Sequence, residues 1–393
     1  MSESIVVVGL ARTPMGGMQG ALGAVTVTEL GAVAIKGALH RAQLSPDSVD
    51  EVMMGCVLPA GVGQAPARQA AIAAEIPSSV PACTVNKVCG SGMKTVMQAC
   101  NSLLLGENHV VVAGGMESMS NAPYLLSKAR QGYRLGHGEL LDHMFIDGLQ
   151  DAYENELMGV YAENTADKYN FSRQEQDAFA IDSLNKANAA ILDGAFESEI
   201  APVTIKNRKE TIVVSTDEQP GNARPEKIPG LKPAFRENGT VTAANSSSIS
   251  DGAAALVLMR KNDASEKKIT PLAEVKGFAQ YAQAPEWFTT APVGAMQKLL
   301  AKIGWSVDDV DLFEINEAFA VVTMAAMKEL HIPKEKVNVH GGACALGHPL
   351  GASGARILVT LISALQRYGK KKGIASLCIG GGEAVAMAVE VND

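Results

Sequence analysis

Two stretches of this 393-residue sequence resemble each other at a distance of about 260 residues. Residues 44–52 (LSPDSVDEV) resemble residues 305–312 (WSVDDVDL), and each stretch follows an apolar, helix-like segment and leads into a strand-like one. Because self-similarity at a fixed offset is the signature of a repeated structural unit, the pattern predicts a chain built from two similar halves.

The similarity continues beyond this first match. Ile76-Pro77 and Ile332-Pro333 each precede a strand-like run, a turn and a helix-like segment, which in the second half covers residues 355–366. In each half a further strand-like run closes on glycines, Gly114-Gly115 in the first and Gly380-Gly381-Gly382 in the second. Since strands and helices alternate in this way, we expect an α/β fold made of two pseudo-symmetric layered halves.

Residues 120–247 interrupt this alternation. They include a loop-like stretch at 132–138 (GYRLGHG) and a charge-dotted helical segment at 171–193, and the strands of the first half resume at 253–259 (AAALVLM). A long insertion on a rigid scaffold is a usual place for a ligand-binding surface. We therefore expect residues 1–119 and 248–270 to form the first half, residues 120–247 to be an insertion in it, and residues 271–393 to form the second half.

Charge and hydropathy narrow the function classes. The chain has 34 Lys and Arg against 42 Asp and Glu, a formal charge of −8, which argues against general binding of nucleic acid or of an anionic membrane. With 47% hydrophobic residues it is too apolar for intrinsic disorder, yet no stretch approaches ~18 apolar residues. No targeting signal is recognisable, and the six cysteines lack the spacing of a disulfide framework. We expect a cytoplasmic protein with reduced thiols.

The block at 85–93 (VNKVCGSGM) places a cysteine between a strand and a helix. Apolar residues recur at helical spacing from Met93 to Leu104, which puts Cys89 at the helix N-terminus. There the helix dipole and the unpaired N–H groups are expected to lower the thiol pKa, as a sulfur nucleophile requires, and to offer an oxyanion site. The alternative is a buried cysteine that packs as a small hydrophobic residue, but the flanking glycines favour the nucleophile.

A second block, at 341–354 (GGACALGHPLGASG), holds a histidine in a loop of small residues. His348 stands at the point of the second half that corresponds to the Cys89 turn of the first. Two turns related by a pseudo-dyad would face one cleft, so the sequence predicts a Cys–His pair. A structural or exposed histidine is the alternative. The loop lacks the Gly-Lys-Ser/Thr of a P-loop, which argues against nucleotide hydrolysis.

Two more blocks follow strand-like runs in the second half. In residues 377–383 (LCIGGGE), Cys378 stands before three glycines, where backbone can approach a ligand and a thiolate can act as a general base. In residues 314–320 (EINEAFA), Asn316 lies between a strand and a helix, where it either orients a water molecule or caps the helix.

Four blocks, 86–93, 316–320, 341–356 and 378–382, resemble the signature blocks of the thiolase family, and within it those of the acetyl-CoA C-acetyltransferases. The likeness also includes residues 12–14, 66–69 and 114–120, so it extends over nearly the whole chain. It implies the thiolase fold, with a CoA-binding loop domain inserted in the first half. It also implies a homotetramer that is a dimer of dimers.

The resemblance implies a reversible Claisen condensation of two acetyl-CoA molecules to acetoacetyl-CoA and CoA, with thiolysis as the reverse reaction. His348 would take the proton of Cys89, whose sulfur would carry the acetyl group, and Cys378 would remove the α-proton of the second acetyl-CoA. His348 and a water held by Asn316 would form one oxyanion hole, and the N–H groups of Cys89 and Gly380 the other.

CoA and acetyl-CoA would bind as substrates, with no permanently bound cofactor and no metal. Ser247 matches the CoA-contacting serine of the family. Arg224 and Lys227 fall in the stretch whose basic residues approach the CoA nucleotide, or else are solvated surface residues. A few fixed cations would reconcile an anionic ligand with the net charge of −8. Four further residues would contact CoA: Ala243, Phe288, Met158 and Phe319.

The chain departs from its family in the insertion. Leu157-Met158-Gly159 stands where short-chain-specific members have His-Met-Gly, which weakens the prediction of strict acetoacetyl-CoA specificity. At Phe288 the chain resembles the mitochondrial acetoacetyl-CoA thiolase, an enzyme that also accepts substrates with a 2-methyl branch. Phe179 replaces a tyrosine of the potassium site of that enzyme, so we expect weak or absent potassium activation.

The same sequence blocks allow four other interpretations. The first is a broader-range 3-ketoacyl-CoA thiolase of fatty-acid breakdown. A decarboxylating ketoacyl synthase is disfavoured, because those enzymes pair the cysteine with two His or with His and Asn, and position 378 is Cys. A non-enzymatic acyl-CoA or sterol carrier would not need Cys89, His348 and Cys378 together. Finally, Cys89 and Cys378 could oxidise to a disulfide, as a liability or a switch.

Overall fold

Strand β1 (Ile5–Arg12) shows why the chain folds into layers. All eight of its residues are buried, and its first side chains alternate between two apolar clusters, with Ile5 and Val7 in one and Val6 and Val8 in the other. Successive side chains of a strand point to opposite faces, so a strand that is apolar throughout must be covered on both faces. The computed structural model, which describes residues 3–206 and 210–391, provides this cover with helices.

Most of the described strands belong to one sheet, and the two halves build it in the same way. Its strands are β1, β3 (Glu51–Gly55), β4 (Ala82–Val85), β5 (Val110–Ser118) and β10 (Ser250–Arg260) of the first half, and β11 (Ala273–Ala282), β12 (Leu312–Ile315), β13 (Lys372–Ile379) and β14 (Glu383–Glu390) of the second. Their order is β12-β13-β14-β11-β1-β10-β5-β3-β4, and a short strand, β2 (Gly16–Gly17), pairs with β10.

The pairing pattern of the first half recurs in the second. Strand β3 is parallel to β5, while β5–β10 and β10–β1 are antiparallel. Correspondingly, β12 is parallel to β13, while β13–β14 and β14–β11 are antiparallel. The halves meet where β1 pairs with β11 over three residues. The expectation of an α/β fold with two pseudo-symmetric halves is therefore confirmed.

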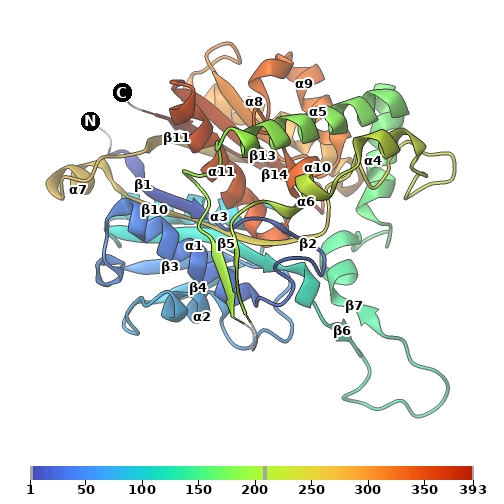
Figure 1. Cartoon of the computed structure of the whole chain (residues 1–393), viewed down its shortest axis with the longest axis horizontal. Coiled ribbons are helices and arrows are strands. Elements are labelled where there is room, and N and C mark those ends of the chain that lie inside the picture. The colour runs from blue at the N-terminus through green and yellow to red at the C-terminus, as the bar shows by residue number, and fades with distance from the viewer. Residues whose placement is uncertain (1–2, 207–209, 392–393) are drawn as a thin grey trace.

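Helices cover the outer faces of the sheet and fill the space between its halves. They are α1 (Val27–Ala42), α2 (Pro66–Ala73) and α3 (Ser91–Leu105) of the first half, and α8 (Ala291–Ile303), α9 (Ala320–Leu330) and α11 (Leu350–Arg367) of the second. Helices α1 and α2 cover one outer face, and α8 and α9 the other. Helices α3 and α11 pack against each other in the central cluster, with sheet residues of both halves around them (Figure 1).

The prediction of a strand after Ile332-Pro333 is wrong. The stretch after Ile332-Pro333 forms a 3₁₀ turn, Lys334–Lys336, and only Val337 reaches the sheet, by a single parallel bridge to Phe313. In the first half the corresponding stretch is β4, which pairs with β3 over four residues. The second half thus keeps the position of this strand but not its length.

Three local predictions also need correction. Gly114-Gly115 lie inside β5 rather than at its end, because β10 and α11 approach there: a Cβ at Gly115 would be 1.9 Å from the carbonyl oxygen of Gly351. Helix α11 begins at Leu350, before the expected residue 355, and every residue from Leu350 to Leu365 is buried. Leu104, expected in the buried stripe of α3, is 51% exposed.

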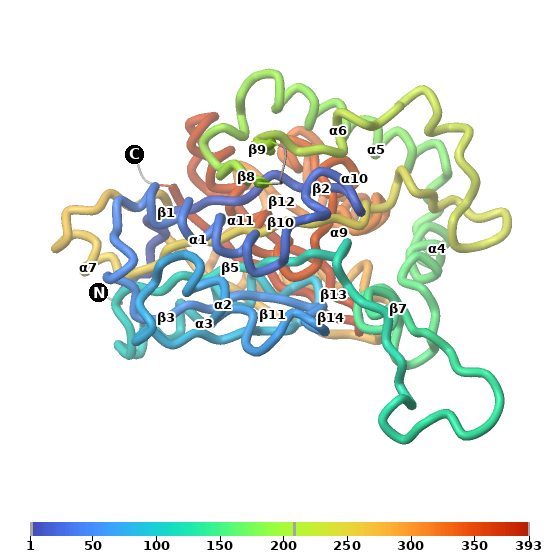
Figure 2. The backbone as a smooth tube through the Cα atoms, turned by 60° about the horizontal axis from the view of Figure 1, so that its bottom comes forward, coloured from blue at the N-terminus to red at the C-terminus, as the bar shows by residue number. Residues whose placement is uncertain are grey.

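Between β5 and β10 the chain leaves the sheet over residues 119–249. The helices and strands of this insertion are β6 (Tyr124–Leu125), β7 (Leu141–Asp142), α4 (Met158–Tyr169), α5 (Arg173–Leu192), β8 (Val203–Lys206), β9 (Thr211–Val214) and α6 (Glu218–Asn222). Buried Arg12 of β1 fastens it to the first half, with Nε 2.5 Å from Glu199 Oε1 and Nη1 2.7 Å from Asp217 Oδ1. The loop between β6 and β7 extends away from the rest of the chain (Figures 1 and 2).

Two short α-helices remain, α7 (Lys261–Glu266) after β10 and α10 (Ala343–Leu346) before the His348 turn, besides short stretches of 3₁₀ helix and one π-helix, Phe145–Leu149. Within the described ranges, no helix combines the length and the apolar character needed to cross a bilayer. The predictions that rest on the extreme ends of the chain, Met1-Ser2 and Asn392-Asp393, lie outside the described residues.

Candidate active site

The turns that carry Cys89 and His348 occupy equivalent places in the two halves. Cys89 lies two residues before α3 and His348 two residues before α11, and these helices pack against each other. Both side chains are buried, and both line one cavity of about 390 Å³. The structure therefore brings the predicted Cys–His pair to one cleft between the halves.

The Cys89 turn is tightly constrained. Val88 has a φ of +46°, which is rare for a β-branched residue, and the side-chain oxygen of Asn86 accepts a hydrogen bond from its N–H at 2.9 Å. A Cβ at Gly90 would lie 2.4 Å from Ile379 Cδ1, so only glycine leaves room for the second-half turn. The cysteine sulfur is thus presented by a strained turn that packs directly against the other half.

The electrostatics of Cys89 correct one prediction. Burial raises the pKa of its thiol to about 11, while hydrogen bonds from the backbone N–H groups of Gly380 and of Cys89 itself lower it only in part. The expectation of a lowered pKa at the helix N-terminus is wrong, because α3 begins only at Ser91 and the desolvation of the sulfur outweighs the nearby N–H groups. A thiol in this state needs a base before it can act as a nucleophile.

His348 is arranged to be that base. Burial, followed by the charge of Arg356, lowers its pKa to about 3, so the imidazole is neutral at physiological pH. Its Nδ1 lies 2.6 Å from Ser353 Oγ, and that hydroxyl donates to the carbonyl oxygen of Pro349 at 2.8 Å. A hydroxyl has a single hydrogen, so Ser353 must accept from Nδ1–H, which leaves Nε2 with its lone pair free.

Asn316 follows β12 and lies beside this histidine. Its Nδ2 is 3.4 Å and 3.5 Å from the two ring nitrogens of His348. Its Oδ1 is buried and has no hydrogen-bond partner among the described residues. The helix-cap alternative fails, because α9 begins at Ala320 and its N-cap residue is Phe319.

Cys378 is the penultimate residue of β13 and is fully buried. It packs in an apolar cluster with Phe288 and Phe319, which line the cavity, so its sulfur lies behind the cavity wall rather than on it. Burial raises its pKa well above the ordinary value, and a charge on Cys89 raises it further. Gly380, two residues later, lines the cavity itself.

An ion pair joins the two turns outside the cavity. Lys87, two residues before Cys89, contacts the carboxylate of Glu383, the residue that follows the three glycines. Both side chains are partly exposed. The pair therefore connects the first-half and second-half turns at their solvent side.

The predicted CoA residues divide between two adjacent cavities. Arg224 and Lys227 line a second cavity of about 350 Å³, which shares Ala243 and Ser248 with the first. The remaining five line the same cavity as Cys89: Ser247, Ala243, Phe288, Met158 and Phe319. A basic cavity thus continues into an apolar one that ends at the sulfur.

Several residues of the apolar cavity were not predicted from the sequence. Leu350 follows His348-Pro349 directly, and this position alone could have identified it. Phe145, Gly148 and Leu149 lie on a short π-helix, Phe145–Leu149, and the others on irregular segments, namely Ala234, Phe235, Ser246, Ser248, Ile249 and Ala318. The departure at Leu157 also lines this cavity, where it adds an apolar side chain.

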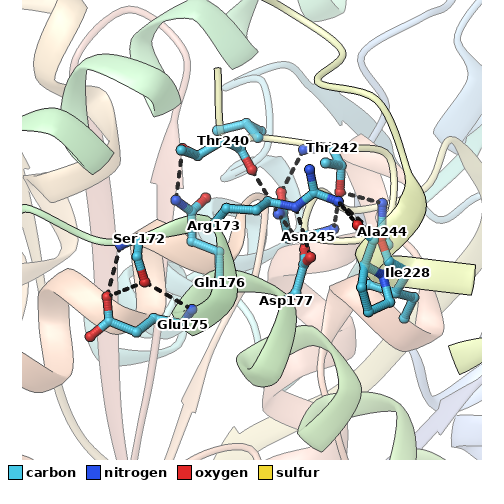
Figure 3. A network of polar contacts seen from close by, with 12 residues as sticks. Ser172, Arg173, Glu175, Gln176, Asp177, Ile228, Thr240, Thr242, Ala244 and Asn245 are labelled. Carbon is cyan, nitrogen blue, oxygen red and sulfur yellow. Dashed lines mark hydrogen bonds and ion pairs between the residues drawn. The ribbon is translucent and has the colours of Figure 1, made fainter. Parts of the chain in front are cut away.

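A buried polar network supports the segment that carries Ser247 (Figure 3). Asp177 of α5 accepts from Arg173 Nε at 2.7 Å and from Asn245 Nδ2 at 3.0 Å. Asn245 in turn accepts from the N–H of Thr242 at 2.7 Å, and Arg173 Nη2 donates to the carbonyl of Ile228 at 2.9 Å. Helix α5 thereby holds both the 242–245 segment and the turn next to Lys227.

Phe179 lies in a small cavity with Ser183 and the buried Glu317. Its ring offers no oxygen to a cation, so the expectation of weak potassium activation stays a prediction. Across residues 3–206 and 210–391, no group of three or more His, Cys, Asp or Glu side chains is arranged to hold a metal ion.

Comparison with known proteins identifies relatives over the full chain. The model of the thiolase N-terminal domain matches residues 5–262, and that of the thiolase C-terminal domain matches residues 269–391. The chain is 50% identical to acetyl-CoA acetyltransferase of Cupriavidus necator, over 98% of this chain and 99% of that protein. It is 49% identical to the cytosolic acetyl-CoA acetyltransferase of Mus musculus, over 99% and 98% of the two chains.

Two solved structures share the fold. The acetyl-CoA acetyltransferase of Bacillus anthracis superimposes with a TM-score of 0.97 at 44% identity, covering 100% of this chain and 99% of the other. A thiolase of Ascaris suum in complex with coenzyme A superimposes with a TM-score of 0.94 at 42% identity, covering 99% and 100%.

Proposed function

The chain belongs to the thiolase family and has the thiolase fold, and we propose that it is an acetyl-CoA C-acetyltransferase. It condenses two acetyl-CoA molecules reversibly to acetoacetyl-CoA and CoA. One observation carries the proposal: Cys89, a neutral His348 with an unprotonated Nε2, and Gly380 line one cavity, and a second buried cysteine, Cys378, packs against the phenylalanines of its wall.

The acetyl-transfer step uses Cys89 and His348. Nε2 of His348 takes the thiol proton, and the sulfur attacks the thioester carbonyl of acetyl-CoA. The carbonyl–sulfur bond to CoA breaks, and CoA leaves as a thiol after receiving the proton of Cys378, which becomes a thiolate, while His348 keeps the proton of Cys89. The N–H groups of Gly380 and Cys89, which already face the sulfur, stabilise the oxyanion of this step.

The condensation step uses Cys378 and Asn316. Cys378, as a thiolate, removes an α-proton from the second acetyl-CoA, and its raised pKa makes this thiolate a strong base. The enolate carbon attacks the acetyl group, a C–C bond forms, and the bond to Cys89 breaks. The enolate oxygen is stabilised by His348 and by a water molecule held by Asn316. The proton held by His348 then returns to the sulfur of Cys89, while Cys378 keeps the α-proton, which restores the starting state.

Residues 120–247 bind CoA in this proposal. Arg224 and Lys227 approach the phosphates of the nucleotide, while the pantetheine arm follows the apolar cavity past Ala243 and Ser247 to Cys89. CoA and acetyl-CoA enter as substrates, and none of these steps uses a resident cofactor or metal. The similar thiolase of Ascaris suum was solved in complex with coenzyme A, which supports this assignment.

A second candidate is a broader-range 3-ketoacyl-CoA thiolase, and Leu157 favours it. This side chain and several phenylalanines make the cavity wall apolar, so longer or branched acyl chains lose little on entry. A rate series distinguishes the two: thiolysis of 3-ketoacyl-CoAs from four carbons upward, including the 2-methyl compound. A steep fall after four carbons supports the acetyl-specific enzyme, whereas a flat series supports the broader one.

The main test is condensation from acetyl-CoA alone, without a malonyl donor. We expect acetoacetyl-CoA and CoA in equimolar amounts at low yield, because the condensation is uphill, and rapid thiolysis in reverse. An enzyme that condenses only when a malonyl thioester is supplied would contradict the proposal and favour a ketoacyl synthase.

We further propose a cytoplasmic homotetramer. The mouse relative is named cytosolic, which supports the compartment. The loop between β6 and β7 carries apolar side chains that a monomer would leave in water, among them Leu135, which is 98% exposed, and Leu140, which is 67% exposed. Light scattering of the purified protein, with and without a Leu135→Ser substitution, tests whether this loop joins copies of the chain.

A further inference from the structure

Glu117 occupies the place in the first half that Cys378 occupies in the second. Each is the penultimate residue of its strand, Glu117 in β5 and Cys378 in β13. The sheet register agrees with this equivalence. Gly55, the last residue of β3, pairs with Gly115, two positions before Glu117. Ile315, the last residue of β12, pairs with Ser376, two positions before Cys378. The mechanism uses Cys378, but gives its counterpart no role.

The carboxylate of Glu117 is fully buried and accepts three backbone N–H groups. Two belong to the loop after β3, with Val57 N at 3.0 Å and Leu58 N at 3.1 Å. The third belongs to the other half: Gly351 N donates to Glu117 Oε2 at 2.8 Å. Gly351 is the second residue of α11, three residues after His348. A first-half side chain thus holds the start of the helix that follows the histidine.

The end of β5 and the start of α11 are in such close contact that there is no room for a side chain at Gly351. A Cβ at Gly351 would lie 2.8 Å from the carbonyl oxygen of Met116 and 2.9 Å from Glu117 Oε2. The end of β13 is likewise in close contact with the turn of the first half, because Ile379 fills the space beside Gly90. The end of each strand therefore supports the turn of the opposite half.

We propose that Glu117 is a positioning residue for His348: its hydrogen bond to Gly351 fixes the His348 turn relative to Cys89. It does not line the cavity, so it acts through the histidine rather than on the substrate. This inference rests on the proposed function of the site.

The energetics of Glu117 agree with a role beyond stability. Burial raises its pKa to about 7, although the N–H groups of Val57, Leu58 and Gly351 lower it. The three hydrogen bonds therefore offset the desolvation of the carboxylate only in part. The carboxylate is therefore retained at a cost in desolvation, although its removal would leave three buried N–H groups without an acceptor.

The test is the substitution Glu117→Gln. An amide has one acceptor oxygen, so it cannot serve all three N–H groups, and its NH₂ group would face at least one of them. We expect kcat for acetyl transfer to fall by about 10- to 100-fold, because displacement of a general base by ~1 Å has effects of this size. KM for acetyl-CoA should stay within about twofold, because the residues proposed to contact CoA lie outside the displaced turn. The rate at which iodoacetamide alkylates Cys89 should fall in parallel with kcat.

Cys56→Ala is the matched control. It removes the other side-chain contact of Glu117, at 3.7 Å, but keeps the three N–H bonds, so kcat should be nearly unchanged. Unaltered kcat in a folded Glu117→Gln protein overturns the proposal. If this variant does not fold, Glu117→Asp, which keeps the charge but is too short for all three bonds, must show the same split between kcat and KM. Failure of both variants to fold would assign Glu117 to stability and also overturn the proposal. Acetyl transfer by the wild-type protein tests the proposed function separately.

Discussion

The two halves share a topology but use its equivalent places differently. Three places recur: the residue after β3 or β12, the residue two before α3 or α11, and the penultimate residue of β5 or β13. They hold Cys56, Cys89 and Glu117 in the first half, and Asn316, His348 and Cys378 in the second.

Burial and contacts separate these two sets. In the first half only Cys89 reaches the cavity, while Cys56 and Glu117 contact each other in the interior. In the second half His348 lines the cavity, Asn316 lies beside it, and Cys378 packs with Phe288 and Phe319, which also line the cavity. The duplication thus supplies equivalent positions, and the residue type at each decides whether it performs chemistry or supports the opposite turn.

The insertion is the other difference between the halves. The connection from β5 to β10 spans residues 119–249 and carries the segments proposed to bind CoA, whereas β13 and β14 are joined by Gly380-Gly381-Gly382 alone. Gly381 and Gly382 have φ values of +91° and +89°, which other residues rarely adopt. A short glycine turn keeps the second-half N–H groups close to Cys89, while the long insertion leaves room for a large ligand.

The largest expected effect tests the first-half nucleophile. Cys89→Ser should reduce acetyl transfer by on the order of 10⁴-fold or more, because a hydroxyl is a far weaker acid than even a buried thiol and His348 cannot activate it. Release of CoA from acetyl-CoA measures the loss. Cys83→Ser is the control, since Cys83 is exposed on β4, away from the cavity, and its loss should leave the rate unchanged.

The next effect tests the division of labour between the halves. Cys378→Ala should abolish condensation, and with it exchange of the α-hydrogens of acetyl-CoA with solvent, yet still accumulate acetyl-Cys89. Mass spectrometry detects the acetyl group, and proton exchange is followed by NMR in D₂O. Normal condensation by this variant would show that another group is the base. The two equivalent residues, Glu117 and Cys378, would then not differ in the way proposed, one as a support and the other as a catalytic base.

The smallest effect tests the link between the two turns. Glu383→Lys should lower kcat by a few-fold at most, because a partly exposed ion pair contributes only ~0–1 kcal/mol. The double substitution Lys87→Glu with Glu383→Lys should restore most of the loss, and high salt should reduce the difference between the variants. If the charge-swapped protein is no better than the single variant, the pair does not couple the turns.

Local patterns predicted much of this site because its residues adjoin the ends of regular elements. Cys89, His348 and Cys378 could be found from glycines, a helix start or a strand end within a few positions. Phe145, Phe235 and Ile249 could not, because they come together only when separate segments of the insertion fold over the cavity. The same holds for Glu117, since nothing near it in sequence indicates that its partner is Gly351.

The sequence by itself determined the duplicated α/β pattern and the residues placed at its turns, because hydrophobic periodicity and glycine positions are local properties. Only the tertiary structure decided the electrostatic state of those residues. The Cys89 pKa rises to about 11 and that of His348 falls to about 3 because the packing of α3 against α11 removes both side chains from water. The desolvation of each side chain depends on atoms from both halves, so these pKa shifts cannot be predicted from either half of the sequence alone.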